Sequence, residues 1–385
     1  MSNPGIIRPE NSDVIIVAGE ASGDLHGAHL VRAMHEINPD LCFYGVGGEK
    51  MKAAGVSLIA HSSEMAVMGL VEVVPKLGFI MKVKRELKKI IRQSRPALLI
   101  LIDYPGFNLS LAKFARKNGI KVFYYISPKV WAWRKKRIYT LEKCVDRMAL
   151  ILPFEEQVYE TVHLDARFVG NPLLDTVKRQ YTRTEALEML GLKEGMKTVA
   201  LLPGSRKGEV TRLLPEMLSM AETLKDRISD IQFVLPLADT LSYDFVHGFT
   251  RRCGVDVKIV EGNVYDAVGI SDIAVVASGT ATLETALLGV PMIIVYRVSP
   301  LTYYIGRMVV NVEHIGLVNL IAGKTIIPEL IQGDANSEKM ADMVYDILDS
   351  APRMDEMKRD LRAVGEMLGV PGASGRAARM ACEMI

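Results

Sequence analysis

The chain reads VALLPGSR at residues 199–206 and IAVVASGTATLE at residues 273–284, and each stretch is an apolar run that passes into a polar turn. Runs of this length and composition are typical of strands buried on both faces of a parallel sheet. Turns that follow such strands lie together at one edge of the sheet, where α/β proteins bind their ligands. The two stretches therefore predict an α/β fold with a ligand site built from both turns.

The residues of these turns suit a diphosphate that carries a ribose or a sugar. Glycine lets a phosphate approach the main chain, and backbone N–H groups at a helix start attract anions. Arg206 adds a permanently charged, forked donor, and Glu284 can accept hydrogen bonds from both hydroxyls of a ribose. The other binding candidates are Gly204, Ser205, Ser278, Gly279, Thr280 and Thr282. The alternative for any one of them is a helix cap or a turn residue.

Strand-sized apolar runs recur through both halves of the chain and alternate with helical patterns. They lie at 14–17, 41–44, 98–102, 122–126 and 147–152 in the first half, and at 198–202, 232–236, 257–260, 273–277 and 292–296 in the second. This alternation is typical of a doubly wound parallel sheet with helices on both faces. We therefore predict two Rossmann-like domains, over residues 1–170 and 171–354, with helices at about 355–385 that pack back on the first.

The composition is that of a well-packed globular protein. Of the 385 residues, 49% are hydrophobic and 24% are charged, and the formal net charge is only +2, so no nucleic-acid partner is expected. The four cysteines are scattered without metal-binding spacing, which fits reduced thiols in the cytoplasm and disfavours zinc. The first residues do not resemble a secretory signal, and the longest apolar runs are too short to span a membrane. We expect a cytoplasmic protein.

Asp103 is the candidate catalytic residue. It ends the apolar run at residues 98–102 and precedes the turn YPGFN at residues 104–108. A carboxylate at the carboxyl end of a strand points into the ligand crevice. It can accept a proton from an attacking hydroxyl if its neighbours keep it partly desolvated. The alternative is an aspartate that caps the following helix.

Another turn, GEASGDLHG at residues 19–27, follows the first predicted strand. It lacks the G-x-G-x-x-G pattern, so a dinucleotide is disfavoured and no cofactor is expected. Ser22, Asp24 and His26 are candidates for substrate contact. A structural role is an equal alternative for His26.

Residues 65–95 form an apolar and basic segment. A helix here places Ile80, Val83, Leu87 and Ile90 on one stripe and lysine or arginine on its other faces. Amphipathic basic helices dock on anionic lipid, and the methionines before this one can accommodate acyl chains. The predicted membrane and acyl surface consists of Met68, Leu70, Val71, Val74, Leu77, Phe79, Ile80, Lys84, Lys88, Lys89 and Arg92. The alternative is an ordinary helix that packs its apolar stripe on the core.

Two further features leave alternatives open. Trp131 and Trp133 precede or join a basic run at residues 134–137, which could stack nucleic-acid bases, but the balanced charge elsewhere disfavours this interpretation. Asn319 lies among apolar residues. A buried asparagine needs hydrogen-bond partners, which are either a ligand or the backbone.

Taken together, these stretches resemble lipid-A-disaccharide synthases, a family of bacterial inverting glycosyltransferases. The matching stretches are VAGEASGDLHG (17–27), MGLVEV (68–73), IDYPGFN (102–108), YISP (125–128), VWAWR (130–134), FVGNP (168–172), LPGSR (202–206), SGTATLE (278–284) and VNLIAG (318–323). They occur in order along essentially the whole chain.

The resemblance implies a GT-B architecture, in which two Rossmann-like domains face each other across a cleft and the C-terminal domain holds most of the nucleotide. The implied reaction joins UDP-2,3-diacylglucosamine to 2,3-diacylglucosamine 1-phosphate, and gives a β-1,6-linked tetraacyl disaccharide 1-phosphate and UDP. It assigns Asp103 to the general base and Arg206 to the diphosphate. One departure is Gly106, where family members often carry a second aspartate. The chain has no Asp-x-Asp pair, so no divalent metal is expected.

The partners implied by the resemblance are the two acylated sugars and the anionic surface of the inner membrane, with no obligate protein partner. A rival within the same architecture is a UDP-N-acetylglucosamine 2-epimerase or a transferase with a soluble acceptor. The apolar and basic segment at residues 65–95 favours a lipid substrate over these. A rival of another class is a non-catalytic protein that binds lipids or nucleotide sugars, which would tolerate the loss of Asp103.

Overall fold

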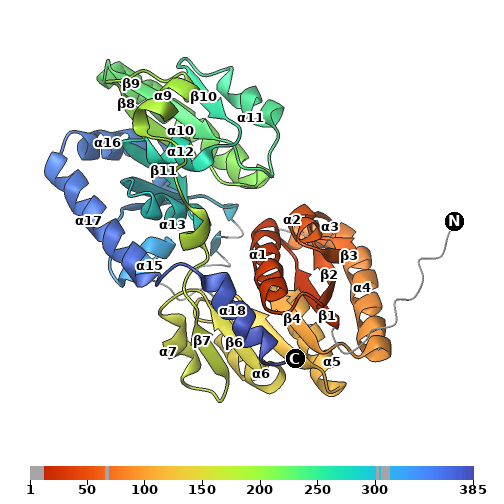
Figure 1. Ribbon diagram of the computed structural model, residues 1–385. Coiled ribbons are helices and arrows are strands. Elements are labelled where there is room, and N and C mark those ends of the chain that lie inside the picture. Colours follow the sequence, from red (N-terminus) through yellow and green to blue (C-terminus); the bar gives the residue numbers. More distant parts are fainter. Residues whose placement is uncertain (1–12, 66–68, 301–302, 305–312) are drawn as a thin grey trace. The chain divides into compact units, whose positions relative to one another are not determined.

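The computed structural model describes residues 13–65, 69–300, 303–304 and 313–385, with the side chains of residues 69–76 left undescribed. The chain folds into two compact units, coloured along the sequence in Figure 1. The first unit consists of Met1–Pro172 and Gly369–Ile385, and the second of Leu173–Leu368.

The first unit is built on a parallel sheet of seven strands. They are β1 (Asp13–Ala18), β2 (Cys42–Gly47), β3 (Val56–His61), β4 (Leu98–Ile102), β5 (Lys121–Tyr125), β6 (Arg147–Leu150) and β7 (Asp165–Phe168). Their order in the sheet is β3-β2-β1-β4-β5-β6-β7. The central strands β1 and β4 are buried along their whole length, as expected of strands covered on both faces.

Helices cover both faces of this sheet. They are α1 (Ala21–Ile37), α2 (Glu49–Ala53), α3 (Ser62–Met65), α4 (Gly69–Ser94), α5 (Pro105–Lys117), the 3₁₀ helix η1 (Lys135–Arg137), α6 (Ile138–Cys144), α7 (Glu155–Tyr159) and α18 (Ala373–Cys382). One core cluster joins the sheet to α4, α5 and α6. A second cluster, on alternate residues of the same strands, joins it to α1 and α18.

The second unit has a parallel sheet of six strands with the order β10-β9-β8-β11-β12-β13. The strands are β8 (Lys197–Leu202), β9 (Ile231–Pro236), β10 (Val257–Val260), β11 (Ile273–Ala277), β12 (Met292–Tyr296) and β13 (Glu329–Ile331). Its helices are α8 (Leu173–Thr176), α9 (Arg183–Leu190), α10 (Lys207–Arg227), α11 (Tyr243–Thr250), α12 (Val264–Gly269), α13 (Thr280–Leu287), α15 (Leu317–Ala322), η2 (Gln332–Asp334), α16 (Ser337–Leu348) and α17 (Ala351–Met367).

Both sheets have the doubly wound Rossmann order. The chain moves outward from the first strand of each unit, then returns to place the fourth strand on the other side of the first. The pair β1 and β4 in the first unit, and β8 and β11 in the second, therefore flank a topological switch point, where such sheets bind ligands. The predicted α/β fold with two Rossmann-like units is confirmed.

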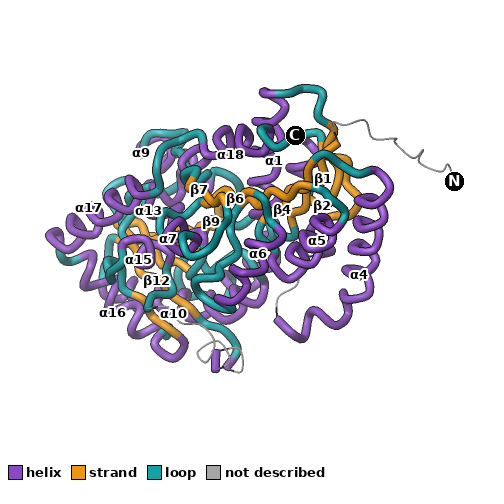
Figure 2. Tube along the Cα trace, turned by 90° about the horizontal axis from the view of Figure 1, so that it is seen from below, coloured by secondary structure: helices purple, strands orange, loops and turns teal. Residues whose placement is uncertain are grey.

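The chain returns to the first unit later than residue 355. Helix α17 stays in the second unit, where it packs on α13, α15 and α16. Only α18 belongs to the first unit, and it lies beside α1 in both views (Figure 1 and Figure 2). Arg376 donates to the carbonyl of Val169 at 2.7 Å, and Lys121 to that of Met384 at 2.6 Å. The difference arises because α17 carries its own apolar stripe, which the helices of the second unit cover.

None of the described helices combines the length and the apolar character needed to cross a lipid bilayer.

Candidate active site

Asp103 and Glu20 lie at the switch point of the first unit. Strands β1 and β4 pair in parallel, with Ala18 opposite Ile102, so the residues that follow them emerge side by side. Asp103 comes directly after β4, and Glu20 comes two residues after β1. The sequence pattern predicts the position of Asp103 but indicates no role for Glu20.

The Asp103 carboxyl lies in surroundings that suit a proton acceptor. Its pKa is raised to about 6, chiefly by burial and also by the nearby carboxylate of Glu20, while Lys129 and the backbone N–H of Tyr104 oppose the shift. A general base works best when its pKa is near the working pH, because it is then ionised and still basic enough to take a proton. Asp103 therefore has the electrostatic character of a general base.

The backbone around Asp103 is held in an unusual conformation. Asp103 has a φ of 44° and Tyr104 a φ of 45°, both in the left-handed region, which costs about 1–3 kcal/mol per residue outside glycine. Asn108 offsets part of this cost, since its side-chain N–H₂ donates to the carbonyls of Ile102 at 3.1 Å and Asp103 at 2.8 Å. The hydroxyl of Tyr124 also donates to the Asp103 carbonyl. Such overdetermined strain is typical of functional sites.

Tyr104 closes this turn against the first strand. Its hydroxyl donates to the carbonyl of Met65 at 2.9 Å, and its ring covers Gly19. A Cβ at Gly19 would lie 2.5 Å from that ring, so no other residue fits there without displacing it. The turns after β1 and β4 are thereby locked together.

The pKa of Asp103 predicts the pH dependence of activity. Because the base must be ionised, kcat/KM is expected to fall about tenfold per pH unit below pH 6. Glu20→Gln removes a negative neighbour and should move this acidic limb to lower pH, whereas Lys129→Gln should move it to higher pH. Profiles of kcat/KM against pH for the three proteins test this. Limbs that coincide, or that move in the opposite directions, would rule out Asp103 as the titrating group.

The other polar residues after β1 differ in their burial and in their hydrogen-bond partners. Ser22 is exposed in the first turn of α1. His26 is buried, which lowers its pKa to about 4, with His29 adding to the shift, so its ring is neutral at pH 7. Its Nδ1 has no hydrogen-bond partner among the described residues. Asp24 has a structural role instead, because its carboxylate accepts the backbone N–H groups of Gly48 at 2.6 Å and Met51 at 2.9 Å at the start of α2.

The second unit brings the two polar turns together. Strands β8 and β11 are neighbours, with Leu202 opposite Val276, so residues 203–206 and 278–280 emerge at the same edge. The first turn leads into α10 and the second into α13, and both helices direct backbone N–H groups toward this edge. This is the arrangement that binds phosphate in doubly wound sheets.

Arg206 and Gly204 make a tight turn before α10. Gly204 has a φ of 109°, and a Cβ there would lie 2.5 Å from a carboxylate oxygen of Glu209, so the position requires glycine. Nη1 of Arg206 lies 3.1 Å from Oε1 of Glu209, in an exposed ion pair of low intrinsic strength. A diphosphate can therefore replace this partner at small cost. Ser205 is exposed beside it, and its carbonyl accepts from Thr240.

The hydroxyls of the second turn are used differently from the prediction. Ser278 donates to the carbonyl of Ile315 at 3.0 Å, and the buried Thr282 donates to that of Gly279 at 2.8 Å. Both hydroxyls therefore stabilise the turn, since short polar side chains near a helix start commonly donate to nearby backbone carbonyls. Thr280 is exposed at the first position of α13, and the space beside Gly279 is open.

Glu284 is oriented by a tyrosine from the neighbouring helix. The Tyr265 hydroxyl of α12 donates to Oε1 of Glu284 at 3.1 Å. Burial raises the pKa of Glu284, and the bond from Tyr265 opposes that shift. Among the described residues no partner contacts its second carboxylate oxygen, which can accept from a donor such as a ribose hydroxyl.

The side chain of Asn319 bonds to the protein itself, mainly to the backbone, as one of the two alternatives above predicts. It is fully buried, and its Nδ2 donates to the carbonyl of Ile327 at 2.7 Å and to Glu329 at 2.7 Å. Its Oδ1 accepts from the backbone N–H of Ile326 at 2.9 Å and of Ile327 at 3.0 Å. Because every donor and acceptor of the amide is satisfied inside the unit, Asn319 organises the entry to β13.

The predicted membrane surface on α4 is described only in part. Met68 lies outside the described residues, and the side chains of Leu70, Val71 and Val74 are not described. Leu77 is 49% exposed, whereas Phe79 and Ile80 are half-buried against the core.

The far half of α4 packs on the core through the buried Val83, Leu87 and Ile91, and the predicted Ile90 is half-buried against the same core. Lys88 and Arg92 lie over the ring of Phe114, while Lys89 is exposed. Burial and the nearby Lys88 lower the pKa of Lys84.

Several residues around the candidate base were not predicted. Glu20 belongs to the stretch that follows β1, and Asn108 and Tyr104 belong to the turn after Asp103. The roles of Glu20 and Tyr104 depend on β1 and β4 being neighbours, so only the sheet order could have suggested them, whereas the bonds of Asn108 are local to its own turn. Tyr265 lies inside the helix after β10, and its bond to Glu284 depends on how α12 and α13 pack.

Comparisons with known proteins place the chain in a family. A family model described as lipid-A-disaccharide synthetase matches residues 14–367. A lipid-A-disaccharide synthase of Syntrophus aciditrophicus is 55% identical over 373 residues, which are 97% of each chain. Its counterpart in Geobacter sulfurreducens is 46% identical over 372 residues, also 97% of each.

Solved structures at low identity share the fold. A UDP-GlcNAc 2-epimerase from Neisseria meningitidis, bound to UDP-GlcNAc, has a TM-score of 0.64 at 10% identity over 96% of this chain and 98% of that one. CalG4, the calicheamicin glycosyltransferase, has a TM-score of 0.61 at 12% identity over 98% of each. These agree with the two Rossmann-like sheets of the GT-B architecture. On the family model and the identity to its relatives, the chain belongs to the lipid-A-disaccharide synthase family.

Proposed function

We propose that this chain is an inverting glycosyltransferase that joins UDP-2,3-diacylglucosamine to 2,3-diacylglucosamine 1-phosphate. The products are a β-1,6-linked tetraacyl disaccharide 1-phosphate and UDP. Family membership supports a glycosyltransferase of lipid A biosynthesis. The observation that carries the chemistry is Asp103, whose pKa is raised to about 6 at the switch point of a doubly wound sheet.

In this mechanism the first unit binds the acceptor and the second binds the UDP-sugar. The 6-hydroxyl of the acceptor gives its proton to Asp103 as its oxygen forms a bond to the anomeric carbon of the donor. The bond from that carbon to the diphosphate oxygen breaks, and its electron pair leaves with UDP. Attack from the face opposite UDP inverts the anomeric centre in one displacement, so no second nucleophilic carboxylate is needed.

The second unit supplies the groups that would stabilise the departing diphosphate. They are the guanidinium of Arg206, the exposed Thr280 hydroxyl and the backbone N–H groups at the start of α13. The cation of this scheme is an arginine, and a divalent metal has no assigned role. Glu284, oriented by Tyr265, would accept the ribose hydroxyls of the nucleotide.

We further propose that the enzyme works in the cytoplasm at the surface of the inner membrane. Its acylated substrates reside there, and α4 presents exposed basic residues at Lys82, Arg85 and Lys89. These three positions lie on one side of the helix, opposite to the buried stripe. Basic helices of this kind are attracted to anionic lipid by about 1 kcal/mol per charge.

Charge reversal on α4 is expected to weaken binding to anionic vesicles. The triple variant Lys82→Glu, Arg85→Glu and Lys89→Glu leaves Lys88 and Arg92 on the Phe114 ring, so the fold should be kept. Cosedimentation with phosphatidylglycerol vesicles measures the effect. A matched triple reversal on the exposed face of α17, at Lys358, Arg359 and Arg362, should leave vesicle binding nearly unchanged. Equal losses in both variants would point to net charge and not to α4.

The decisive experiment for the reaction is incubation of the purified protein with both acylated substrates. Mass spectrometry should detect a tetraacyl disaccharide monophosphate, and proton NMR of the product should show the β configuration. UDP-N-acetylglucosamine without acceptor serves as a control for epimerase activity, which the shared fold also accommodates. Epimerised sugar without any disaccharide would overturn the proposal.

A further inference from the structure

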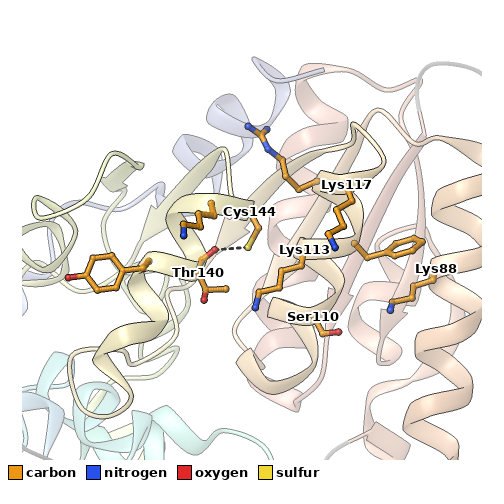
Figure 3. A pocket seen from close by; sticks show the side chains of 10 residues that line it. Lys88, Ser110, Lys113, Lys117, Thr140 and Cys144 are labelled. Carbon is orange, nitrogen blue, oxygen red and sulfur yellow. Dashed lines mark hydrogen bonds between the residues drawn. The ribbon is translucent and has the colours of Figure 1, made fainter.

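A groove in the first unit lies between the helix that follows Asp103 and the helix beside it. Helices α5 and α6 pack together, and between them a cavity of about 370 Å³ is lined by Gly106, Ser110, Lys113, Arg137 and Thr140. A larger pocket of about 600 Å³ continues along α5 and shares Ser110, Lys113 and Thr140 with it. Figure 3 shows Lys113 of α5 directed toward Thr140 of α6, with Ser110 on the same helix as Lys113.

The cations of this groove have no counter-ion among the residues that the structure describes. Arg137 is half-buried, and burial together with the nearby Arg134 lowers its pKa. Both guanidiniums lie over the ring of Trp133, at 4.4 Å for Arg134 and 5.1 Å for Arg137. Within the described part of the chain, neither Arg137 nor Lys113 has a carboxylate in ion-pair range. A partly desolvated cation of this kind is stabilised by an anion.

The donors around the cavity match a phosphate monoester. Arg137 can offer two parallel N–H groups, Lys113 a point charge, and Ser110 and Thr140 two hydroxyls. None of the residues that line the cavity is acidic. A dianionic phosphate has three oxygens free for such donors, whereas a carboxylate has two.

The groove is adjacent to the candidate base. Gly106 lies three residues after Asp103, and it is exposed, so this end of the groove is open. Tyr124 lies near enough to Arg137 to raise the pKa of that guanidinium, and the Tyr124 hydroxyl donates to the Asp103 carbonyl. A sugar whose hydroxyl reaches Asp103 can therefore place a group on its other side in this groove.

We propose that the groove between α5 and α6 binds the 1-phosphate of the acceptor sugar through Arg137, Lys113, Ser110 and Thr140. The inference rests on the proposed function, since it concerns the acceptor of that reaction. It gives the first unit a positively charged subsite that selects a phosphorylated acceptor and orients its far hydroxyl toward Asp103. The basic run at residues 134–137, considered above for nucleic acid, thereby gains a role with a small phosphate.

The test compares two acceptors on several proteins. The acceptors are 2,3-diacylglucosamine 1-phosphate and the same sugar without phosphate. For the phosphorylated acceptor, Arg137→Gln and Lys113→Ala are each expected to lower kcat/KM by about ten- to a hundredfold, the usual loss for a hydrogen bond to a charged group. For the dephosphorylated acceptor the same variants should match the unchanged protein, and KM for the UDP-sugar should not move. Lys136→Ala, which removes a neighbouring exposed charge, is the control.

Each outcome of this test either supports or overturns the proposal. Equal losses with both acceptors would mean that Arg137 and Lys113 do not contact the phosphate. The variants Arg137→Gln and Lys113→Ala could instead cosediment less with phosphatidylglycerol vesicles and keep the preference for the phosphorylated acceptor. That result would assign the groove to a lipid headgroup and overturn the proposal. If the unchanged protein made no disaccharide at all, the proposed function would fail instead. Glucosamine 1-phosphate binding, measured by NMR on the unchanged protein and on the exposed-residue variant Lys113→Ala, would then test the groove by itself.

Discussion

Asp103→Asn should lower kcat by about a thousandfold while the affinity for UDP stays within a factor of about two, since general-base catalysis typically contributes a hundred- to ten-thousandfold. The amide cannot take the proton of the acceptor hydroxyl. The variant should fold, because the network around this residue uses its backbone carbonyl, which accepts from Asn108 and Tyr124. Asparagine also tolerates the left-handed conformation that Asp103 adopts.

Single-turnover rates and calorimetric UDP binding measure the two effects separately. A variant that keeps near-normal turnover would remove Asp103 from the role of base. A variant that loses turnover together with its cooperative thermal unfolding would say nothing about chemistry, so the melting temperature is the control. Asn108→Ala is a useful companion, because it releases the strained turn without touching the carboxyl. It should reduce kcat less than Asp103→Asn does.

Arg206→Ala should damage both UDP affinity and turnover. In the proposed mechanism the guanidinium contacts the diphosphate before and during its departure, so its loss should weaken UDP binding about tenfold or more and lower kcat by about a hundred- to a thousandfold. Arg206→Lys should recover only part of this, because an ammonium cannot make the forked contact. Calorimetry with UDP and steady-state kinetics with saturating acceptor measure the two losses.

The neighbouring Lys207→Ala is the matched control for Arg206. Lys207 is also exposed at the start of α10, but it lies over the ring of Phe245. Its removal should leave UDP binding nearly intact. Equal effects at residues 206 and 207 would indicate a general field of positive charge, and an unchanged UDP affinity in Arg206→Ala would contradict the placement of the diphosphate.

Most strands could be predicted because their sequences are largely apolar. Strands β4, β10, β11 and β12 have the predicted bounds, and the others that were predicted differ by a few residues at their ends. Three edge strands were missed, β3, β7 and β13. Strands β3 and β7 mix polar and apolar residues and lack the continuous apolar run on which the prediction relied, whereas the edge strand β10 (VKIV) is mostly apolar and was predicted.

Functional residues that come directly after a strand could be predicted from the sequence, whereas residues whose role depends on packing could not. Asp103 and Arg206 end or follow apolar runs, so the sequence points to them directly. The hydroxyls of Ser278 and Thr282 looked like phosphate donors, yet nearby carbonyls take their protons. Glu20 became visible only when β1 and β4 proved to be neighbours, since side chains that meet across a sheet are separated along the chain.

The return of α18 to the first unit has a consequence for synthesis on the ribosome. Ala377, Ala378 and Met380 are part of the core that also contains Leu30 and Met34 of α1. The nascent first unit must therefore wait, with one face of its sheet partly uncovered, until the whole of the second has been translated. During that interval α1 exposes an apolar face that chaperones can recognise. Ribosomes that stall before residue 369 would release a chain whose first unit lacks α18.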